Sequence, residues 1–510
     1  MRKLALLTLF FTTSLAAQSS LCPQIQSLTQ DSPAHWGISI TTLDGTPLCQ
    51  TDAAQLFRPA SNAKLFTATT ALALLGPNKT FETRVTGNLD PATGTVTGDL
   101  TLIGAGDANL DSGDLPYHPD TRPFTFAALE DLATQLAAKG VKTVTGNIIG
   151  DDTLFPYEPY PQGWEFDDLK WGFGAPVSAL TIADNQLPLT ITPGKLNTPA
   201  TVTLDQHGVL YYTLLGSVGT IDRKVSLPGV RLERVPGTRT LRIFGNIGVT
   251  SAPYTTDIAI DDPAAYAAMA LRQILLAHGI TVTGTPRSQH QPLSDGAGFL
   301  AQLRAPGGPE AEIATGSGFA GSCLGQAYPP TLATHTSAPI SDDILFTLKE
   351  SQNLHAELLL HAVAKVSACA PTDIAGARMI RAFLLHAGIA PDDFLLYDGS
   401  GLSAHDLVTP RSLTQLLVFA AQQPWFPSFK AALPIGGVDG SLSSRFPGPL
   451  KGRIFAKTGT LGESRALSGF LTAASGHTLV FSILVDNHPP SSTADRTLMD
   501  HIVELTAASN

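Results

Sequence analysis

Three short motifs that together would form a single site stand far apart in this 510-residue chain. They are, in order, Ser61-Asn62-Ala63-Lys64, Ser351-Gln352-Asn353 and Lys457-Thr458-Gly459. Their hydroxyl, amine and amide groups are those from which a nucleophile, a base, a proton shuttle and an anion-binding site are built. About 290 residues separate the first motif from the second. A chain that unites the three must therefore bring its two ends together around a long inserted segment.

The length and charge of the chain bound its class. A chain of 510 residues is too long for one hydrophobic core, so we expect two or three domains. Charged residues make up only 15% of the chain, and the net charge is −11. Nucleic acid is excluded as a partner because no basic stripe is available to neutralise phosphates. The same charge gives no support for adhesion to an anionic membrane.

The N-terminus is typical of an export signal. Arg2 and Lys3 precede a short apolar run over residues 4–15, and Ser14-Leu15-Ala16 offers small residues for cleavage. We assign residues 1–17 to a signal peptide, since the run is too short to span a bilayer. No second apolar run of that kind follows, so the mature protein is predicted to be soluble, without a transmembrane anchor, outside the cytoplasm.

The four cysteines fit an oxidising compartment, in which disulfides persist. Four cysteines allow three pairings, and we favour the local one, Cys22–Cys49 and Cys323–Cys369, with four buried free thiols as the alternative. The chain has no Cys/His spacing typical of a zinc site, and we expect neither a metal nor a cofactor.

The two ends of the chain predict an antiparallel sheet packed with helices. Residues 36–49 have the pattern of a hairpin, and Pro59 precedes an apolar helix that ends near Leu75. Residues 341–349, capped by Ser341-Asp342-Asp343, and 353–366 are predicted helices. Residues 453–460, 465–474 and 477–485 are predicted strands before a last helix over 492–506. This pattern indicates an α+β core closed by both chain ends.

The middle of the chain has a different pattern. A helix over 126–139 followed by strand-like residues 141–149 is repeated at 263–278 and 280–284. Residues 156–257 are rich in β-branched residues, Pro and Gly without a helical period. We therefore predict a catalytic domain over 18–77 and 335–510, an inserted α/β domain over 78–155 and 258–334, and a nested β-rich domain over 156–257.

The chemistry of the motifs assigns a role to each polar group. Ser61 is the candidate nucleophile, and Lys64, one helical turn later, is its candidate base. Burial and the second cation, Lys457, are both expected to lower the pKa of Lys64. Ser351 could carry the proton to the leaving nitrogen, and Asn353 could hold a substrate amide through both its oxygen and its NH₂ group.

The third motif is the candidate binding edge. Lys457 and Thr458 would bind a terminal carboxylate, and Gly459 would let the strand backbone approach the substrate. The backbone N–H groups of Ser61 and Thr460 would form an oxyanion hole.

With these motifs in place, the sequence resembles the class C low-molecular-mass penicillin-binding proteins, the D-alanyl-D-alanine carboxypeptidase/endopeptidase family. The resemblance covers nearly the whole mature chain and includes several further segments: Gly98-Asp99-Leu100 through Gly106-Asp107, Gly163-Trp164-Glu165-Phe166-Asp167-Asp168, Tyr397-Asp398-Gly399-Ser400-Gly401-Leu402-Ser403, Gly437-Val438-Asp439-Gly440-Ser441-Leu442 and Ala456-Lys457-Thr458-Gly459-Thr460-Leu461.

The resemblance implies both a fold and a reaction. It implies a penicillin-binding-protein/β-lactamase-like catalytic domain with two nested inserted domains, in the bacterial periplasm. Ser61 would attack the D-Ala-D-Ala bond of peptidoglycan stem peptides, with cleavage of D-Ala–diaminopimelate cross-links as a related activity. β-Lactams would acylate the same serine. Asp168 is the candidate for recognising the diaminopimelate amino group.

Two other functions remain open at the sequence level. A β-lactamase would share the nucleophile and the base, but no glutamate is placed like the deacylating acid of class A enzymes. A non-catalytic envelope scaffold would have no need of Lys64 or Lys457. His355 is predicted to be a packed or surface histidine, since no G-x-S-x-G elbow accompanies it. Asp398 and Asp439 are predicted to be structural turn residues.

Overall fold

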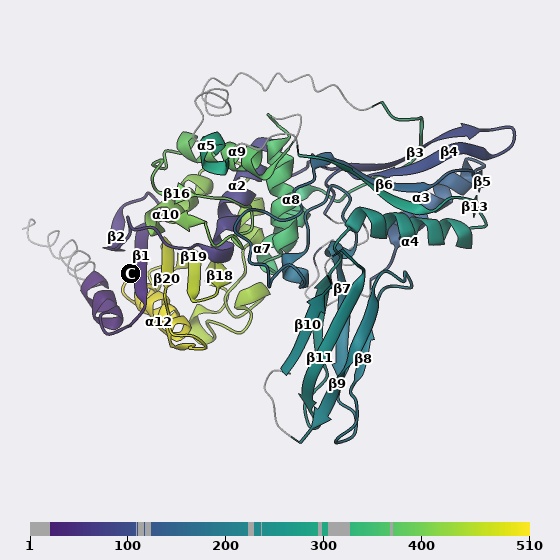
Figure 1. Cartoon of the computed structure of the whole chain (residues 1–510). Coiled ribbons are helices and arrows are strands. Elements are labelled where there is room, and N and C mark those ends of the chain that lie inside the picture. Colours follow the sequence, from purple (N-terminus) through teal and green to yellow (C-terminus); the bar gives the residue numbers. More distant parts are fainter. Residues whose placement is uncertain are drawn as a thin grey trace, which may run out of the picture.

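Alternating hydrophobic strands near both ends of the chain form the central sheet of the computed structural model (Figure 1). The structure describes residues 21–108, 110, 117, 124–222, 229–235, 237–293, 298–303, 327–367 and 371–510. The predicted signal peptide over 1–17, Cys323 and Cys369 lie outside this set. Among the described residues, none of the helices combines the length and the hydrophobicity that a bilayer-spanning helix needs.

The central sheet has the strand order β18-β19-β20-β1-β2. Its strands are β1 (His35–Thr42), β2 (Pro47–Thr51), β18 (Ile454–Leu461), β19 (Ser464–Thr472) and β20 (Thr478–Asp486). All neighbours are antiparallel, and β1 from the N-terminal part pairs with β20, with Ile38 opposite Ile483. The α+β core closed by both chain ends is therefore confirmed.

Helices cover both faces of this sheet, and the strand sequence explains why. Leu479 to Val485 of β20 are all buried. Val480 and Leu484 pack with the helices α2 and α10, whereas Phe481 and Ile483 pack with α12 on the opposite face. Successive side chains of a strand point to opposite faces of the sheet, so a strand that is buried along this whole stretch has to be covered on both sides.

The helices of the larger layer carry two of the motifs. They are α2 (Ala63–Leu75), α7 (Ile340–Lys349), α8 (Asn353–Ala364), α9 (Asp373–His386), α10 (Pro410–Ala421) and α11 (Phe426–Ala432). The predicted cap at Ser341-Asp342-Asp343 is wrong, because α7 begins at Ile340 after Pro339 and no side chain caps it. Asp343 instead faces His355, so tertiary contact rather than capping holds this carboxylate.

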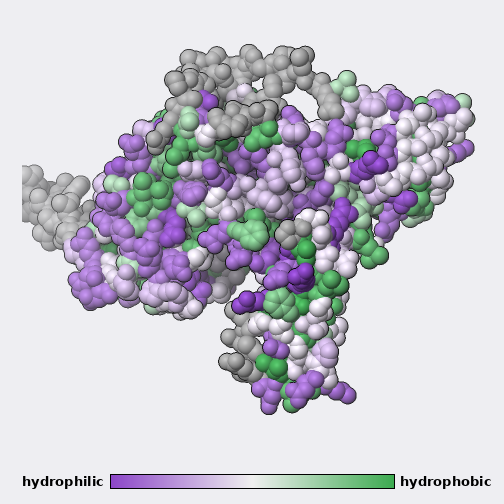
Figure 2. Space-filling model, viewed as in Figure 1, coloured by the Kyte–Doolittle hydropathy of each residue, from purple (hydrophilic) through white to green (hydrophobic). Residues whose placement is uncertain are grey.

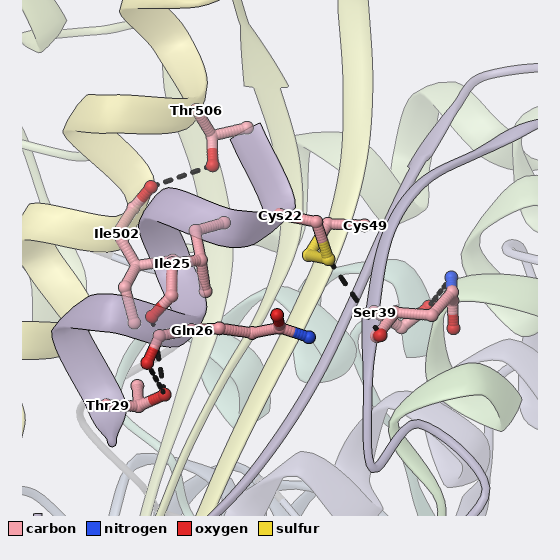
Figure 3. Close-up of a disulfide and its surroundings, with 9 residues drawn as sticks. Cys22, Ile25, Gln26, Thr29, Ser39, Cys49, Ile502 and Thr506 are labelled. Carbon is pink, nitrogen blue, oxygen red and sulfur yellow. Dashed lines mark hydrogen bonds between the residues drawn. A yellow bond between two sulfur atoms is a disulfide. The ribbon is translucent and has the colours of Figure 1, made fainter. Parts of the chain in front are cut away.

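The second layer pairs the last helix, α12 (Ala494–Ala508), with a helix over residues 21–29. Ile25 and Ile502 belong to one buried cluster, and a disulfide joins Cys22 to Cys49 of β2 (Figure 3). The predicted Cys22–Cys49 pair is confirmed. It ties the start of the described chain to the sheet.

The described residues between the first two motifs form three further sheets. The largest has β13 (Thr281–Val282), β5 (Thr143–Val144), β4 (Thr95–Ile103), β3 (Glu82–Asp90) and β15 (Thr331–Thr336) in this order. β6 (Ile148–Pro156) pairs with β4, and β14 (Pro286–Gln291) pairs with β6. The helix α3 (Ala127–Ala138) is followed by β5 and β6, and the helix α4 (Pro263–Ala277) is followed by β13 and β14. β5 pairs with β13 and β6 pairs with β14, both in parallel, so the two repeated helix–strand units lie side by side.

Two three-stranded sheets extend away from the rest of the molecule (Figure 1). One contains β12 (Tyr254–Ala259), β7 (Gln186–Thr192) and β8 (Thr201–Leu204). The other contains β10 (Gly229–Arg234), β11 (Thr240–Gly248) and β9 (Thr213–Ile221). Hydrophobic patches appear on this projecting part, whereas the face around α12 is largely hydrophilic (Figure 2). Leu210, Leu215 and Phe244 are among the exposed apolar side chains there.

Candidate active site

The first motif lies where a short 3₁₀ turn, η1 (Ala60–Asn62), leads into α2. α2 is buried over most of its length and ends at Gly76, as its sequence predicts. Ser61 is partly exposed, whereas Lys64 is fully buried. The Lys64 Nζ lies 3.0 Å from the Ser61 Oγ. The structure thus places a solvent-accessible hydroxyl against a lysine amine that is shielded from water.

Lys64 has two other acceptors besides Ser61. Its Nζ donates to the Asn353 Oδ1 at 2.6 Å and to the Ser400 carbonyl at 2.8 Å. As an ammonium group, Lys64 uses all three of its protons in these bonds. As a neutral amine it keeps two of them and offers its lone pair to the Ser61 hydroxyl proton.

Burial lowers the pKa of Lys64 to about 8, and three carboxylates, Asp398, Glu357 and Asp406, oppose that effect. We expected Lys457 to lower the pKa of Lys64. Instead, the repulsion between the two amines appears at Lys457, whose pKa is lowered well below its ordinary value by burial and then by Lys64. Two buried amines that repel each other cannot both be charged without a cost in free energy.

The second motif connects α7 to α8 and contains a strained residue. Ser351 has a φ of 65°, in the left-handed region that non-glycine residues rarely adopt. Its Oγ accepts a 2.8 Å hydrogen bond from the Lys457 Nζ, which also donates to the Thr458 carbonyl at 2.9 Å. The second serine and the third motif are therefore in direct contact.

Asn353 is the first residue of α8 and joins two parts of the site. Its Oδ1 accepts from Lys64, and its Nδ2 donates to the Phe173 carbonyl at 2.8 Å. We predicted that both ends of this amide hold substrate. Each end already has one protein partner, which leaves one acceptor lone pair and one N–H for a ligand.

The third motif lies on β18, at the edge of the central sheet. A Cβ on Gly459 would stand 2.9 Å from the Pro59 carbonyl and 3.1 Å from the Ala60 Cβ. This glycine therefore allows the nucleophile segment to pack against the strand. The Thr458 Oγ1 donates to the Ser441 Oγ at 2.7 Å, and Thr460 is exposed at the end of the strand.

Asp168 belongs to a segment that contacts the turn at Asp398. Trp164 of this segment donates from its Nε1 to the Asp398 Oδ2 at 2.8 Å. Asp168 is partly exposed, and burial together with the nearby charges of Glu165 and Asp167 raises the pKa of its carboxyl. Phe166 is 82% exposed in the same segment.

Glu357, a buried carboxylate behind Lys64, was missed by the sequence interpretation. Glu357 accepts the N–H groups of Gly399 and Ser400, each at 2.9 Å. Asp398 accepts from the backbone of Gly401 and Ser403, which fixes the turn whose Ser400 carbonyl bonds to Lys64. The sequence held one indication that Glu357 belongs to the site: it stands four residues after Asn353 and therefore on the same face of α8.

Asp398 and Asp439 have the structural roles that the sequence predicts. Asp398 organises its turn, and Asp439 forms a salt bridge with Lys349 at 2.6 Å. His355 is fully buried and packed, as expected, and its ring nitrogens bond to Asp343 and Asp184 rather than to a serine.

Comparisons with known proteins agree with this geometry. The model of the D-Ala-D-Ala carboxypeptidase 3 (S13) family matches residues 21–306 and 323–509. A D-alanyl-D-alanine carboxypeptidase from an Actinomadura strain is 30% identical over 489 residues, which are 93% of this chain and 82% of the relative. The D-alanyl-D-alanine carboxypeptidase DacB of Haemophilus influenzae is 26% identical over 88% of this chain and 84% of its own length.

A solved structure shows the same fold. Penicillin binding protein 4 from H. influenzae superposes with a TM-score of 0.77 at 24% identity, covering 94% of this chain and 98% of that protein. The penicillin-binding-protein fold predicted from the sequence is therefore confirmed. From the family match and these relatives, the chain belongs to the D-Ala-D-Ala carboxypeptidase 3 (S13) family of serine peptidases.

Proposed function

We propose that this protein is a serine-type D-Ala-D-Ala carboxypeptidase that acts on peptidoglycan stem peptides through an acyl-enzyme on Ser61. The observation that carries the proposal is the 3.0 Å contact between the Ser61 hydroxyl and the buried amine of Lys64. Because burial lowers the pKa of Lys64 to about 8, a useful fraction of this amine is neutral near neutral pH. Family membership supports the same assignment.

In the first step, the Ser61 Oγ attacks the carbonyl carbon of the penultimate D-alanine while Lys64 takes the hydroxyl proton. The carbonyl electrons move to oxygen, where the backbone N–H groups of Ser61 and Thr460 receive them. One such donor is typically worth ~10²–10³ in turnover. When the carbon–nitrogen bond breaks, Ser351 gives its hydroxyl proton to the leaving amine and is reprotonated by the proton that Lys64 took up, and D-alanine departs. Water then hydrolyses the ester and restores Ser61.

The third motif would hold the terminal carboxylate of the substrate. Lys457 and the Thr458 hydroxyl are the candidate donors, with the Lys457 Nζ already 2.8 Å from Ser351. Gly459 keeps β18 close to the nucleophile segment, so a peptide lying along this edge reaches Ser61.

The same acyl-enzyme step would serve a D,D-endopeptidase, in which the leaving amine belongs to diaminopimelate. We keep Asp168 as the candidate for binding the free ammonium group of a diaminopimelate side chain, at the third position of a stem peptide whose own side chain is not cross-linked. This assignment is supported by the position of the segment that contains Asp168, because Trp164 of that segment bonds to the Asp398 turn. A carboxylate there would complement the charge of the ammonium group.

Export to the periplasm belongs to the same proposal. Its supports are the signal-like N-terminus and the Cys22–Cys49 disulfide, because such bonds persist in oxidising compartments. The substrate of the family lies in that compartment.

The experiment that tests the function is intact-protein mass spectrometry over time after mixing with benzylpenicillin. We expect one penicillin adduct that persists and maps to Ser61. An adduct that disappears while the drug is consumed would instead assign a β-lactamase. Complete absence of an adduct would contradict the acyl-enzyme and favour a scaffold.

A further inference from the structure

A buried histidine connects the second motif to the inserted segment. His355 lies two residues after Asn353 on α8 and has no exposed surface. Its Nδ1 is 2.6 Å from the Asp343 Oδ1, and its Nε2 is 3.0 Å from the Asp184 Oδ1. A neutral imidazole donates from only one nitrogen, so two carboxylate partners indicate an imidazolium cation. The two carboxylates raise the pKa of His355 to about 10 despite its burial.

Asp184 also reaches the motif through a second contact. Its Oδ2 accepts from the Gln352 Nε2 at 3.2 Å. Gln352 stands between Ser351 and Asn353 and caps α8 by accepting the Leu354 N–H through its own Oε1. The Asp184 carboxylate therefore binds one residue before Asn353, which is Gln352, and one after it, which is His355.

The backbone around Asp184 is strained, and side-chain hydrogen bonds of the same turn hold it in that conformation. Ala183, Asp184 and Asn185 have φ values of 52°, 50° and 53°. Left-handed backbone is unfavourable for residues other than glycine, and least so for Asn and Asp. The Asn185 side chain accepts the Ile182 N–H and donates to the Pro176 carbonyl, which fixes this turn. A strained turn that presents a buried carboxylate to a catalytic motif points to a function for that carboxylate.

We propose that Asp184, Gln352, His355 and Asp343, here called the Asp184 clamp, position Ser351 and Asn353 for catalysis. None of the four touches the reacting groups, so they are positioning residues. The clamp makes the second motif depend on the inserted segment, since Asp184 lies about 170 residues before it. The catalytic consequence rests on the proposed function, whereas the positioning itself does not.

Two substitutions separate the clamp from general folding. Asp184→Asn keeps the size of the side chain and removes its charge. Gln352→Glu keeps the acceptor for the Leu354 N–H and sets a carboxylate against that of Asp184. We expect acylation by benzylpenicillin to slow at least tenfold in Asp184→Asn and further in Gln352→Glu. The loss should lie in the acylation rate constant more than in the dissociation constant of the preceding complex.

The chain offers a matched control, a second imidazole held by two carboxylates. His290 lies 2.9 Å from Asp152 and 3.7 Å from Asp262, within the inserted segment. Asp262→Asn is chemically the same change as Asp184→Asn, at a residue without a contact to the second motif. We expect it to lower the melting temperature while acylation stays within twofold of the wild type.

Hydrogen–deuterium exchange of peptides covering Ser351 to Leu358 tests the positioning independently of activity. We expect faster exchange there in Asp184→Asn and Gln352→Glu than in the wild type and in Asp262→Asn. If exchange and acylation in both clamp variants equal those of the wild type, the proposal is wrong. If the wild type itself forms no penicillin adduct, the proposed function fails, and the exchange result alone decides whether the clamp exists.

Discussion

Ser61 is the residue on which the proposed chemistry depends. It is partly exposed, and Lys64 keeps two other acceptors when the hydroxyl is removed. We therefore predict that Ser61→Ala abolishes both the penicillin adduct and D-alanine release, while the melting temperature stays nearly unchanged. Mass spectrometry, a D-alanine assay and thermal unfolding measure the three quantities. D-alanine release by the folded variant would remove Ser61 as the nucleophile.

The buried carboxylates behind Lys64 predict a pH dependence. Lys64 has to be neutral to act as a base, so acylation should rise with pH as the pH passes through about 8. Burial raises the pKa of Glu357 itself to about 8, and its ionised form raises the pKa of Lys64, so Glu357→Gln should shift this rise to lower pH. The variant also leaves one backbone N–H of the Asp398 turn without an acceptor, at a cost of about 1–3 kcal/mol.

Acylation rates measured across pH decide this prediction, with Glu130→Gln as the control. Glu130 is an exposed carboxylate on α3 that pairs with His278 and should leave the pH profile unchanged. A shift of the Glu357→Gln profile to higher pH would show that Glu357 does not stabilise the charged form of Lys64.

Asp168 predicts a difference between substrates. If its carboxylate binds the diaminopimelate ammonium group, Asp168→Ala should weaken cleavage of diaminopimelate peptides about tenfold and that of simple D-Ala-D-Ala ligands much less. Comparison of kcat/KM for the two substrates measures this. Asp167→Ala is the neighbouring control, since its side chain is 88% exposed and pairs with Lys170. An equal loss on both substrates would exclude Asp168 from recognition.

The sequence predicts single residues well when local spacing brings them together. Ser61 and Lys64 are three residues apart, and their contact follows from a single turn. Glu357 and its contact with Ser400 were missed because the contact joins α8 to a distant turn, and nothing in the local sequence of either residue indicates it. The strain at Ser351 was likewise invisible, since serine has no special preference for a positive φ.

At the scale of elements, helix and strand periods located most of the sheet and helices around the site. The strands predicted at 453–460, 465–474 and 477–485 correspond to β18, β19 and β20. The start of α7 was misplaced because Ser341 and two acidic residues look like a cap, whereas Asp343 pairs with His355. The prediction of a helix cap uses the local sequence alone, whereas the buried ion pair between Asp343 and His355 of another helix decides where this carboxylate points.

The Cys22–Cys49 disulfide links two elements, and its contribution to the free energy of unfolding can be measured. Its cysteines are 27 residues apart, and the chain-entropy model gives about 3–4 kcal/mol of stabilisation for such a loop. We predict that Cys49→Ser lowers the free energy of unfolding by roughly this amount. Acylation of the folded variant should persist, because the bond lies behind the central sheet in the α12 layer (Figure 3). Loss of acylation at temperatures where the variant is folded would contradict this separation.

At the scale of the whole molecule, the buried apolar residues form separate cores. One core unites the sheets and helices of the inserted segment, and two others cover the faces of the central sheet. Among the described residues, a small apolar cluster that includes Phe155 and Leu358 joins the two parts, together with polar contacts such as that of Asp184 with His355. We propose that the domain boundaries inferred from the sequence, near residues 77 and 335, follow this division. Sequence composition could suggest the division, but not which contacts cross it.

Separate cores predict that heating unfolds the protein in two steps rather than one. Under the proposed function the penicillin adduct forms at Ser61, so its contacts in the folded protein should stabilise the part built on the central sheet. We expect differential scanning calorimetry to show two transitions, of which benzylpenicillin raises one by several degrees and barely moves the other. Reduction of Cys22–Cys49 should lower the same transition that benzylpenicillin raises. A single transition shifted as a whole by both treatments would mean that the Asp184 clamp and the small bridging cluster couple the two parts into one cooperative unit.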